Sequence, residues 1–565
     1  MYLLRVFWIK GSKGFLNSRD GELGQVISEV ILVVVTLATT LTFGFTRLVI
    51  AMLFIRELKI KPMKQVISAF ALLLFGTLSL QAQQSTIDLV QQSELEQHIR
   101  FLASDELQGR YTGSVGNRTA ARYIAEYLRA QGCQPVEGLT DYFQEIPFES
   151  VRPPATATFK VGDKTYTYGE EFFLSNGPAT TIEGGAVFAE HGWVDEAEGI
   201  DNFAGLDVKG KLVFAWSGKP GSRDPQEAFA ASKLKRRLAA ERGAIGLVEV
   251  YRLPFPWKFL LNYLNKESLS IADPDDAATE GLVYGMLNEK SDAPFEAMKF
   301  GEKTLVALTT SGVERSKMHS SNVAAVLEGS DPDLKHEFMV VTAHYDHVGV
   351  AEQGGGFAYG KRDSIFNGAR DNAIGVASMM LTAKVMAVNR PKRSVLFLAL
   401  TAEEQGLIGS SYFVKHPLVP LDKIIFNFNT DGAGYNDTTL VAVMGYDRTG
   451  VAPLIDKGAT EFGLKVIADP APEQGLFDRS DNVSFARKGI PALSYSPGFA
   501  SFDDELMKNY HQVSDEAGTL DYDYLIKYSR SFIETARLIA DDEKRPFWIS
   551  GDKYEEAGKT LYQKK

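Results

Sequence analysis

The chain reads MVVTAHYDH at residues 339–347, SVLFLALTAEE at 394–404 and IIFNFNTD at 424–431. Each stretch begins with a short run of β-branched, aromatic or aliphatic residues that is too apolar to face water on either side. Such runs are typical of strands buried inside a parallel sheet. Amphipathic segments between them are long enough to form crossover helices. We therefore predict an α/β fold with a doubly wound, mostly parallel central sheet.

Each of these predicted strands ends in acid or imidazole side chains. In open α/β sheets, ligands bind beyond the carboxyl ends of the strands, so these side chains should converge. Two further candidates come from the Gly- and Asn-containing loop FNGARDNAIG and from NYHQVSD near residue 511. The candidate metal ligands are His344, Asp371, Glu404, Asp431 and His511. Nitrogen and oxygen donors without a thiolate indicate zinc or a harder divalent ion.

The carboxylate of Asp371 has two oxygens and can bridge two cations, as a two-metal site requires. Two imidazoles and two further carboxylates would then give each ion one nitrogen and one oxygen ligand, with room for a water between the ions. Glu403, beside the candidate ligand Glu404, is placed to act as the general base for that water. Asp346 is predicted to hold the second ring N–H of His344. We interpret His347 and His416 as residues that support a ligand or lie on the surface.

Length and composition exclude several classes of protein. The chain has 565 residues, 45% of them hydrophobic, so it can bury a large core and hold more than one domain. A formal net charge of -12 argues against nucleic acid as a partner. The single cysteine, Cys133, excludes an internal disulfide and a cysteine-ligated zinc site.

Five motifs of this sequence resemble those of the M28 family of zinc peptidases. They are AHYDHVG, NGARDNAIG, LTAEEQGLIGSS, FNTDGAG and YHQVSDE, and they contain His344, Asp371, Glu403 with Glu404, Asp431 and His511 respectively. The resemblance implies a di-zinc aminopeptidase acting on peptides. It also implies one zinc held by His344 and Asp431, the other by Glu404 and His511, Asp371 bridging both, and Glu403 as general base for a metal-bridged hydroxide.

The sequence departs from the family pattern at some positions. Arg370 stands where many relatives have an acid before the bridging aspartate, and GAGYND follows Asp431 in place of the usual apolar-Gly-Arg. Asp481, in RSDNVSF, resembles a Ser-Asp motif that lies near the cleft in this family. These departures bear on substrate preference more than on the metal site.

The resemblance and the composition together predict the domain organisation. The peptidase domain would comprise residues 84–154 and 319–541, interrupted at 155–318 by a β-rich insert that resembles a protease-associated domain. The charged C-terminal tail, 542–565, has few large apolar residues and is expected to pack loosely.

The first 83 residues point to export. Residues 63–83 have the layout of a signal peptide, with Lys64, an apolar run from Val66 to Leu80 and Ala82 near a cleavage point. Residues 1–62 are then upstream sequence from a misassigned start, or alternatively a membrane anchor. We expect a periplasmic or secreted protein, with membrane contact only if the N-terminal segment is retained.

Other activities remain open. A carboxypeptidase or dipeptidase of the same fold would need cationic groups at the cleft, for which Arg370, Arg479 and Arg487 are candidates. A glutaminyl cyclase resembles a one-zinc version of the site, which the full ligand set disfavours. A non-catalytic binding protein using the protease-associated domain would have lost ligands, and none is lost.

Overall fold

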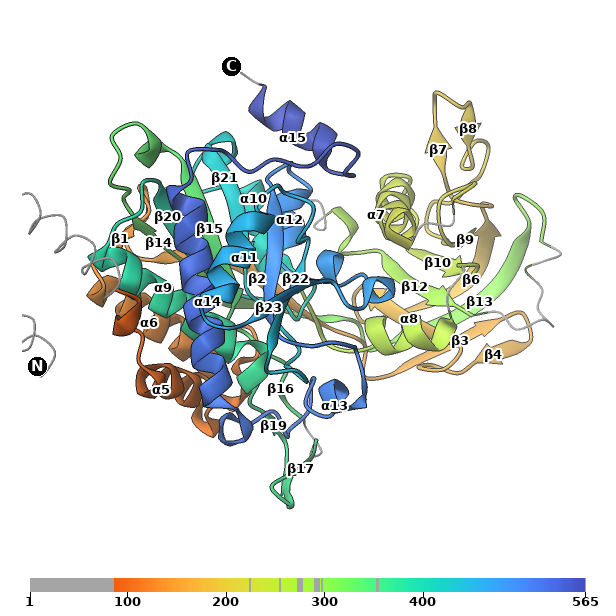
Figure 1. Ribbon diagram of the computed structural model, residues 1–565. Coiled ribbons are helices and arrows are strands. Elements are labelled where there is room, and N and C mark those ends of the chain that lie inside the picture. The colour runs from red at the N-terminus through yellow and green to blue at the C-terminus, as the bar shows by residue number, and fades with distance from the viewer. Residues whose placement is uncertain are drawn as a thin grey trace, which may run out of the picture. The chain divides into compact units, whose positions relative to one another are not determined.

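A computed structural model describes residues 86–222, 225–253, 256–271, 278–288, 295, 298–351 and 355–563. The predictions for residues 1–62 and for the signal peptide at 63–83 lie outside the described residues. Within the described part of the chain, no helix is both long and apolar enough to cross a membrane. Two large β-sheets with their covering helices make up this part (Figure 1).

The larger sheet has ten strands and carries the three stretches quoted above. Its order is β11 (Ser268–Ile271), β2 (Phe143–Arg152), β14 (Glu314–Leu327), β20 (Ser394–Leu400), β15 (Phe338–His344), β21 (Ile424–Asn429), β24 (Ala492–Pro497), β22 (Leu440–Met444) and β23 (Lys465–Ala468), with β1 (Gln134–Pro135) paired to β14. The four central strands β20, β15, β21 and β24 are mutually parallel. The fold is therefore α/β with a parallel centre, as predicted.

Helices cover both faces of this sheet because side chains alternate between two cores. In β20, Val395, Phe397 and Ala399 pack on one face and Leu396, Leu398 and Leu400 on the other. The first core includes α5 (Gln92–Leu102), α6 (Val115–Ala130), α9 (Ile374–Val388), α11 (Ala452–Thr460) and α14 (Tyr522–Asp541). The second core includes α10 (Ile408–Lys415) and α12 (Asn482–Ala486). This two-sided cover leaves the strand ends as the accessible edge.

Strand β14 contains the continuous apolar segment NVAAVLEG, yet it is antiparallel to both β2 and β20. Val323, Ala324, Ala325 and Leu327 are fully or almost fully buried between the two helical layers. A strand buried on both faces has a continuous apolar run whatever its direction, so the pattern alone does not reveal the pairing.

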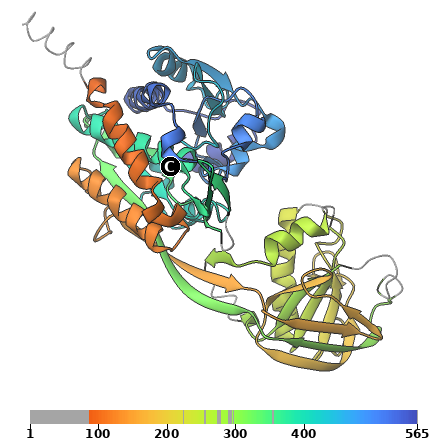
Figure 2. The ribbon, with the colours of Figure 1, turned by 90° about the horizontal axis from the view of Figure 1, so that it is seen from below.

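The second sheet lies between residues 157 and 310. Its order is β4 (Lys164–Tyr166), β3 (Ala157–Val161), β13 (Lys303–Thr310), β6 (Thr180–Phe188), β9 (Leu212–Trp216), β10 (Gly246–Val250), β12 (Val283–Leu287) and β5 (Phe172–Asn176). Helices α7 (Pro225–Glu241) and α8 (Trp257–Leu264) lie beside these strands (Figure 2). One strand from the same stretch of sequence, β11, does not belong to this sheet, because it pairs with β2 in the larger sheet.

The C-terminal tail packs against the larger sheet's domain, so the expectation of loose packing is wrong. Trp548 is 6% exposed and its indole N–H donates to the Gly489 carbonyl oxygen over 3.0 Å. The last helix, α15 (Glu555–Tyr562), lies so close to Gly489 that a Cβ there would come within 2.4 Å of Ala557. A few aromatic anchors suffice to hold a mostly charged segment.

Candidate metal centre

The five candidate ligands meet at the carboxyl edge of the central strands. His344 is the last residue of β15, Glu404 follows β20 and Asp431 follows β21, and these three strands are adjacent and parallel. Asp371 lies in the irregular turn Ala369–Ala373 that leads into α9. His511 lies in the turn that follows α13 (Asp504–Met507).

The two oxygens of Asp371 face two separate groups of donors. Oδ1 lies 3.2 Å from His344 Nε2, which lies 3.2 Å from Asp431 Oδ1. Oδ2 lies 3.2 Å from His511 Nε2, which lies 3.1 Å from Glu404 Oε2. Asp371 is the member that the two groups share.

These separations fit zinc. Donors at bond lengths of about 2.0 Å around a tetrahedral ion are roughly 3.3 Å from one another. The observed nitrogen–oxygen separations of 3.1–3.2 Å match this expected donor–donor separation in both groups. The donors are imidazole nitrogens and carboxylate oxygens, the set that zinc accepts in sites without thiolates.

Two glycines make the Asp371 turn possible. Gly368 has φ 57°, and a Cβ there would lie 2.2 Å from the Asp371 carbonyl oxygen and 2.6 Å from the His347 ring. A Cβ on Gly375 would lie 2.2 Å from Asn372 Oδ1, which accepts the Gly375 N–H. Neighbouring atoms therefore lie so close to Gly368 and Gly375 that a larger residue at either position would displace the backbone around Asp371.

The Asp346 side chain differs from its predicted role. His344 Nδ1 contacts the Asp346 main-chain carbonyl oxygen at 3.2 Å, whereas the nearest carboxylate oxygen is 3.8 Å away. The carboxylate instead accepts the backbone N–H groups of Glu403 and Glu404, over 3.2 and 3.3 Å, and the hydroxyl of Thr112. Asp346 therefore fixes the turn that carries Glu403 and Glu404.

The two remaining histidines of this region, His347 and His416, differ in burial and in contacts. His347 is fully buried, so a surface position is wrong for it, and its Nδ1 lies 2.8 Å from Glu404 Oε1. It belongs to the same group of possible donors as Asp371, Glu404 and His511. His416 is exposed, and its ring packs at a tilt against that of Tyr412.

The cluster carries more carboxylates than cations, which moves several pKa values. Burial would lower the pKa of His511, but Asp371 and Glu404 raise it to about 10. Burial and Asp371 would raise the pKa of Glu404, but His347 and His511 hold it at about 2. Burial raises the pKa of Glu403 well above its usual range, with His344 opposing. The donors thus attract positive charge, which a metal ion supplies in exchange for protons.

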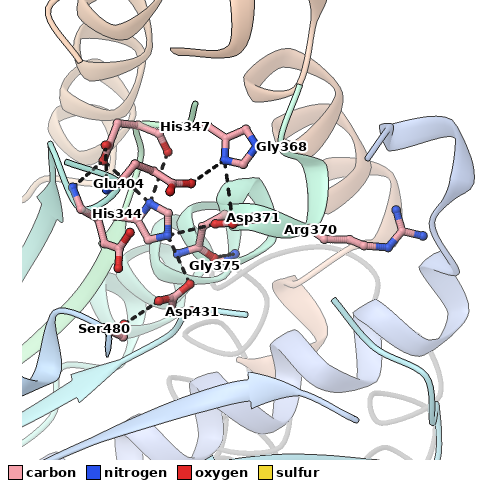
Figure 3. Close-up of polar contacts among 12 residues, drawn as sticks. His344, His347, Gly368, Arg370, Asp371, Gly375, Glu404, Asp431 and Ser480 are labelled. Atoms are coloured by element: carbon pink, nitrogen blue, oxygen red, sulfur yellow. Dashed lines mark hydrogen bonds and ion pairs between the residues drawn. The ribbon is translucent and has the colours of Figure 1, made fainter. Parts of the chain in front are cut away.

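Two supporting residues were not identified from the sequence. The Arg110 guanidinium is buried and donates to the carbonyl oxygens of Leu102, Tyr345, Asn367 and Gly368. Asp515 accepts the N–H groups of Arg370 and Asp371 and the Arg370 guanidinium, over 3.0 to 3.3 Å. The Arg370 side chain consequently points away from the donors (Figure 3). Only the short spacing of Asp515 from His511 hinted at such a role.

A cavity of about 90 Å³ opens at the donors. Its polar walls include Glu403, Arg479, Ser480 and Tyr510, and Ser480 donates to Asp431 Oδ2 over 2.5 Å. The apolar walls are Ala433, Met444, Leu476, Phe499 and Phe502. Asp481 lies outside this lining and is buried, and burial raises its pKa to about 7.

Comparison with known proteins adds an independent observation. Residues 322–536 match the model of peptidase family M28. Vacuolar membrane protease of Saccharomyces cerevisiae (strain YJM789) is 32% identical over 115 residues, which are 20% of this chain and 10% of that protein. Its counterpart in Candida albicans (strain WO-1) is 33% identical over 119 residues, 21% of this chain and 12% of that protein. The chain thus spans about a tenth of the length of these curated relatives.

A solved structure shares the fold. The aminopeptidase from Aneurinibacillus sp. strain AM-1 superposes with a TM-score of 0.51 at 20% sequence identity. The superposition covers 83% of this chain and 98% of that one. At this identity the likeness establishes the architecture.

Proposed function

We propose that this chain, whose residues 322–536 match peptidase family M28, is a zinc metallopeptidase and, more closely, a di-zinc aminopeptidase that removes residues from the N-termini of peptides. The observation that carries the proposal is the division of donors around Asp371, whose two oxygens each face a separate imidazole–carboxylate pair. His344 and Asp431 would hold one ion, Glu404 and His511 the other, and Asp371 both.

Glu403 is proposed as the general base. Zinc ions supply acidification of a water and polarisation of the scissile carbonyl when they are bound. Glu403 lines the same cavity as the five donors, and burial raises its pKa, which suits a group that takes up a proton and gives it to the leaving amine. Asp346 would keep Glu403 in place through its backbone N–H.

A free amino terminus of the substrate could pair with the carboxylates beside the metals. Among these, Glu403 lines the cavity and is not a proposed metal ligand. The apolar walls suit an aliphatic or aromatic first side chain.

Arg479 supports a second candidate, a carboxypeptidase or dipeptidase. Of the three arginines that the sequence suggested, Arg479 lines the cavity, whereas Arg370 is bound to Asp515 and Arg487 is not part of the lining. Its guanidinium could pair with a substrate carboxylate.

A panel of peptides separates these activities. Purified protein is tested on peptides with free or acetylated N-termini and free or amidated C-termini, before and after chelation and zinc return. We expect chelator-sensitive cleavage that requires a free N-terminus. Cleavage that requires a free C-terminus would instead assign a carboxypeptidase. A protein that holds two zinc ions and cleaves nothing would contradict both.

Export and the identity of the insert are also part of the proposal. Residues 63–83 would direct the chain out of the cytoplasm, and the sheet between residues 157 and 310 would be a protease-associated domain. N-terminal sequencing of the exported protein tests the first point. A mature start near Gln83 supports the signal peptide, and a retained Met1 supports an anchor.

A further inference from the structure

The C-terminal segment, residues 545–563, contacts the loops that form the apolar walls of the cavity. One of these loops is the turn Leu476–Arg479, in which Leu476 and Arg479 line the cavity and Phe477 and Asp478 face the segment. The other follows Met444, the last residue of β22 and also part of the lining.

Arg448 connects the segment to both loops. Its guanidinium donates to both oxygens of Asp552, over 2.7 and 3.0 Å. It lies over the rings of Phe477, Trp548 and Tyr554, at 4.1, 5.3 and 5.4 Å from their centroids. The Arg448 guanidinium is thus enclosed by the ring of Phe477, from a loop of the cavity, and by Trp548, Asp552 and Tyr554 of the C-terminal segment.

Further contacts join the segment to the Leu476–Arg479 turn. Asp478 accepts from Lys553 Nζ over 2.6 Å and from the Tyr554 hydroxyl over 2.9 Å. Phe477 in turn limits the loop after Met444, since a Cβ on Gly445 would lie 2.8 Å from its ring. The position of Phe477 therefore bears on both Leu476 and Met444.

The aromatic contacts outweigh the surface ion pair. Asp478 and Lys553 have side chains that are 43% and 53% exposed, and such pairs contribute little. Trp548 and Phe477 are 6% and 7% exposed, and Asp552 is 5% exposed at its side chain. Buried aromatic and bidentate arginine contacts hold geometry more firmly.

We propose that residues 548–554 of the C-terminal segment are a specificity-determining part of the peptidase site, because they hold Leu476 and Met444 at the spacing that admits the substrate's first apolar side chain. This inference rests on the proposed aminopeptidase function. The segment touches no proposed ligand, so it acts on substrate fit and not on the chemical step.

The test uses the full chain with Trp548→Ala, and KM and kcat are measured for peptides that differ only in an N-terminal Leu or Ala. We expect the Leu-over-Ala ratio of kcat/KM to fall about tenfold through KM, within the range that pocket contacts supply, while kcat changes less than about twofold. Trp548→Phe should restore most of the ratio. Lys559→Ala is the matched control, because Lys559 pairs with Glu555 and Glu556 inside α15.

Two results would overturn the inference. One is an unchanged Leu-over-Ala ratio in Trp548→Ala, and the other is an equal loss of kcat/KM for both peptides. If Trp548→Ala does not fold, the double variant Lys553→Met with Tyr554→Phe removes the two Asp478 contacts and is judged by the same ratio, with a smaller expected loss.

Hydrogen exchange separates this inference from the proposed function. Exchange of residues 474–482 should accelerate in Trp548→Ala but not in Lys559→Ala, whatever the wild type cleaves. A wild type that cleaves no N-terminal residue refutes the aminopeptidase. Unchanged exchange in Trp548→Ala refutes the support of the loop by the segment.

Discussion

Two buried groups of charged residues differ in how their charges are balanced. In the second sheet, Lys235 and Glu249 are both fully buried and form an ion pair of 2.7 Å. At the edge of the larger sheet, the carboxylates of the candidate ligands lie next to histidines, and among the described residues they form no ion pair with lysine or arginine. The first group balances one cation with one anion, and the second has an excess of anions.

The Lys235–Glu249 pair is also satisfied by hydrogen bonds. Lys235 Nζ donates to the carbonyl oxygens of Trp216 and Gly218, over 2.8 and 2.6 Å. Glu249 accepts from the hydroxyls of Ser232 and Tyr284, over 2.5 and 2.6 Å. A pair satisfied in this way needs no ligand and serves the fold.

The difference indicates which buried charges are available for chemistry. A group that is complete without a ligand holds loops together, whereas an anionic group at a cavity calls for a cation. Both groups lie near strand ends, so position alone does not separate them. The charge balance does.

The largest effect is expected for Glu403→Gln. Loss of the proposed base should lower kcat by about 10²–10⁴-fold, the usual contribution of a general base, while zinc stays bound. Glu404→Gln should lower both activity and zinc content, because Glu404 lies among the donors. Activity assays paired with metal analysis measure both, and loss of zinc in Glu403→Gln would refute its role as a base.

Removing one member of the Lys235–Glu249 pair should lower the stability of the fold and leave the metal centre unchanged. Lys235→Met leaves Glu249 buried without its cation, which should cost about 3–5 kcal/mol in the free energy of unfolding. Trp193, Trp216 and Trp257 lie in or beside the second sheet, so urea unfolding followed by tryptophan fluorescence reports on it.

Two controls sharpen this test. Lys233→Met, two residues away at an exposed position, should change the unfolding free energy by less than about 0.5 kcal/mol. Adding Glu249→Met to Lys235→Met should recover much of the loss, since apolar replacements of a buried pair are often neutral. A double variant no better than the single one would contradict this explanation.

Asp515→Asn tests the support of the metal centre. The substitution weakens the bonds to Arg370 and to the Asp371 N–H, and removal of such supporting groups typically costs 10–100-fold in metal affinity or activity. Zinc dissociation constants from competition with a chromophoric chelator measure it. Asp521→Ala, which removes the side-chain N-cap of α14, should lower stability without changing zinc affinity.

The smallest effect concerns a buried group that is kept neutral. Burial lowers the pKa of His98 from 6.5 to about 4, and its ring Nδ1 lies 2.8 Å from the Tyr123 hydroxyl. Between these pH values the unfolded chain binds a proton that the folded chain does not, so stability is full above pH 6.5 and falls as the pH falls.

The loss attributable to His98 should reach about 2 kcal/mol at pH 5. Urea unfolding of wild type and His98→Gln at pH 7.5 and pH 5 measures it, because the difference between the two proteins isolates this residue. An equal pH dependence in both would show that His98 is not buried as a neutral group.

The sequence predicted the parts of this molecule that depend on local pattern. Apolar runs predicted β15, β20 and β21, and the rule that parallel strand ends share an edge predicted that His344, Glu404 and Asp431 meet. The antiparallel direction of β14 and the packing of Trp548 were not predicted, because each depends on a partner distant in sequence. Arg110 and Asp515 were missed for the same reason, since their bonds are mainly to backbone atoms of segments distant in sequence, which leave no pattern of side chains.

The buried Arg110 guanidinium has a consequence for dividing the chain. It comes from residues 105–110, well before the region that matches the peptidase family, and it joins the end of β15 to the turn that carries Asp371. A fragment restricted to residues 322–536 would contain every proposed ligand and still lack this link. The smallest autonomous unit is therefore larger than the sequence match, and dissection of this protein should keep the segment Asp105–Arg110 together with residues 322–536.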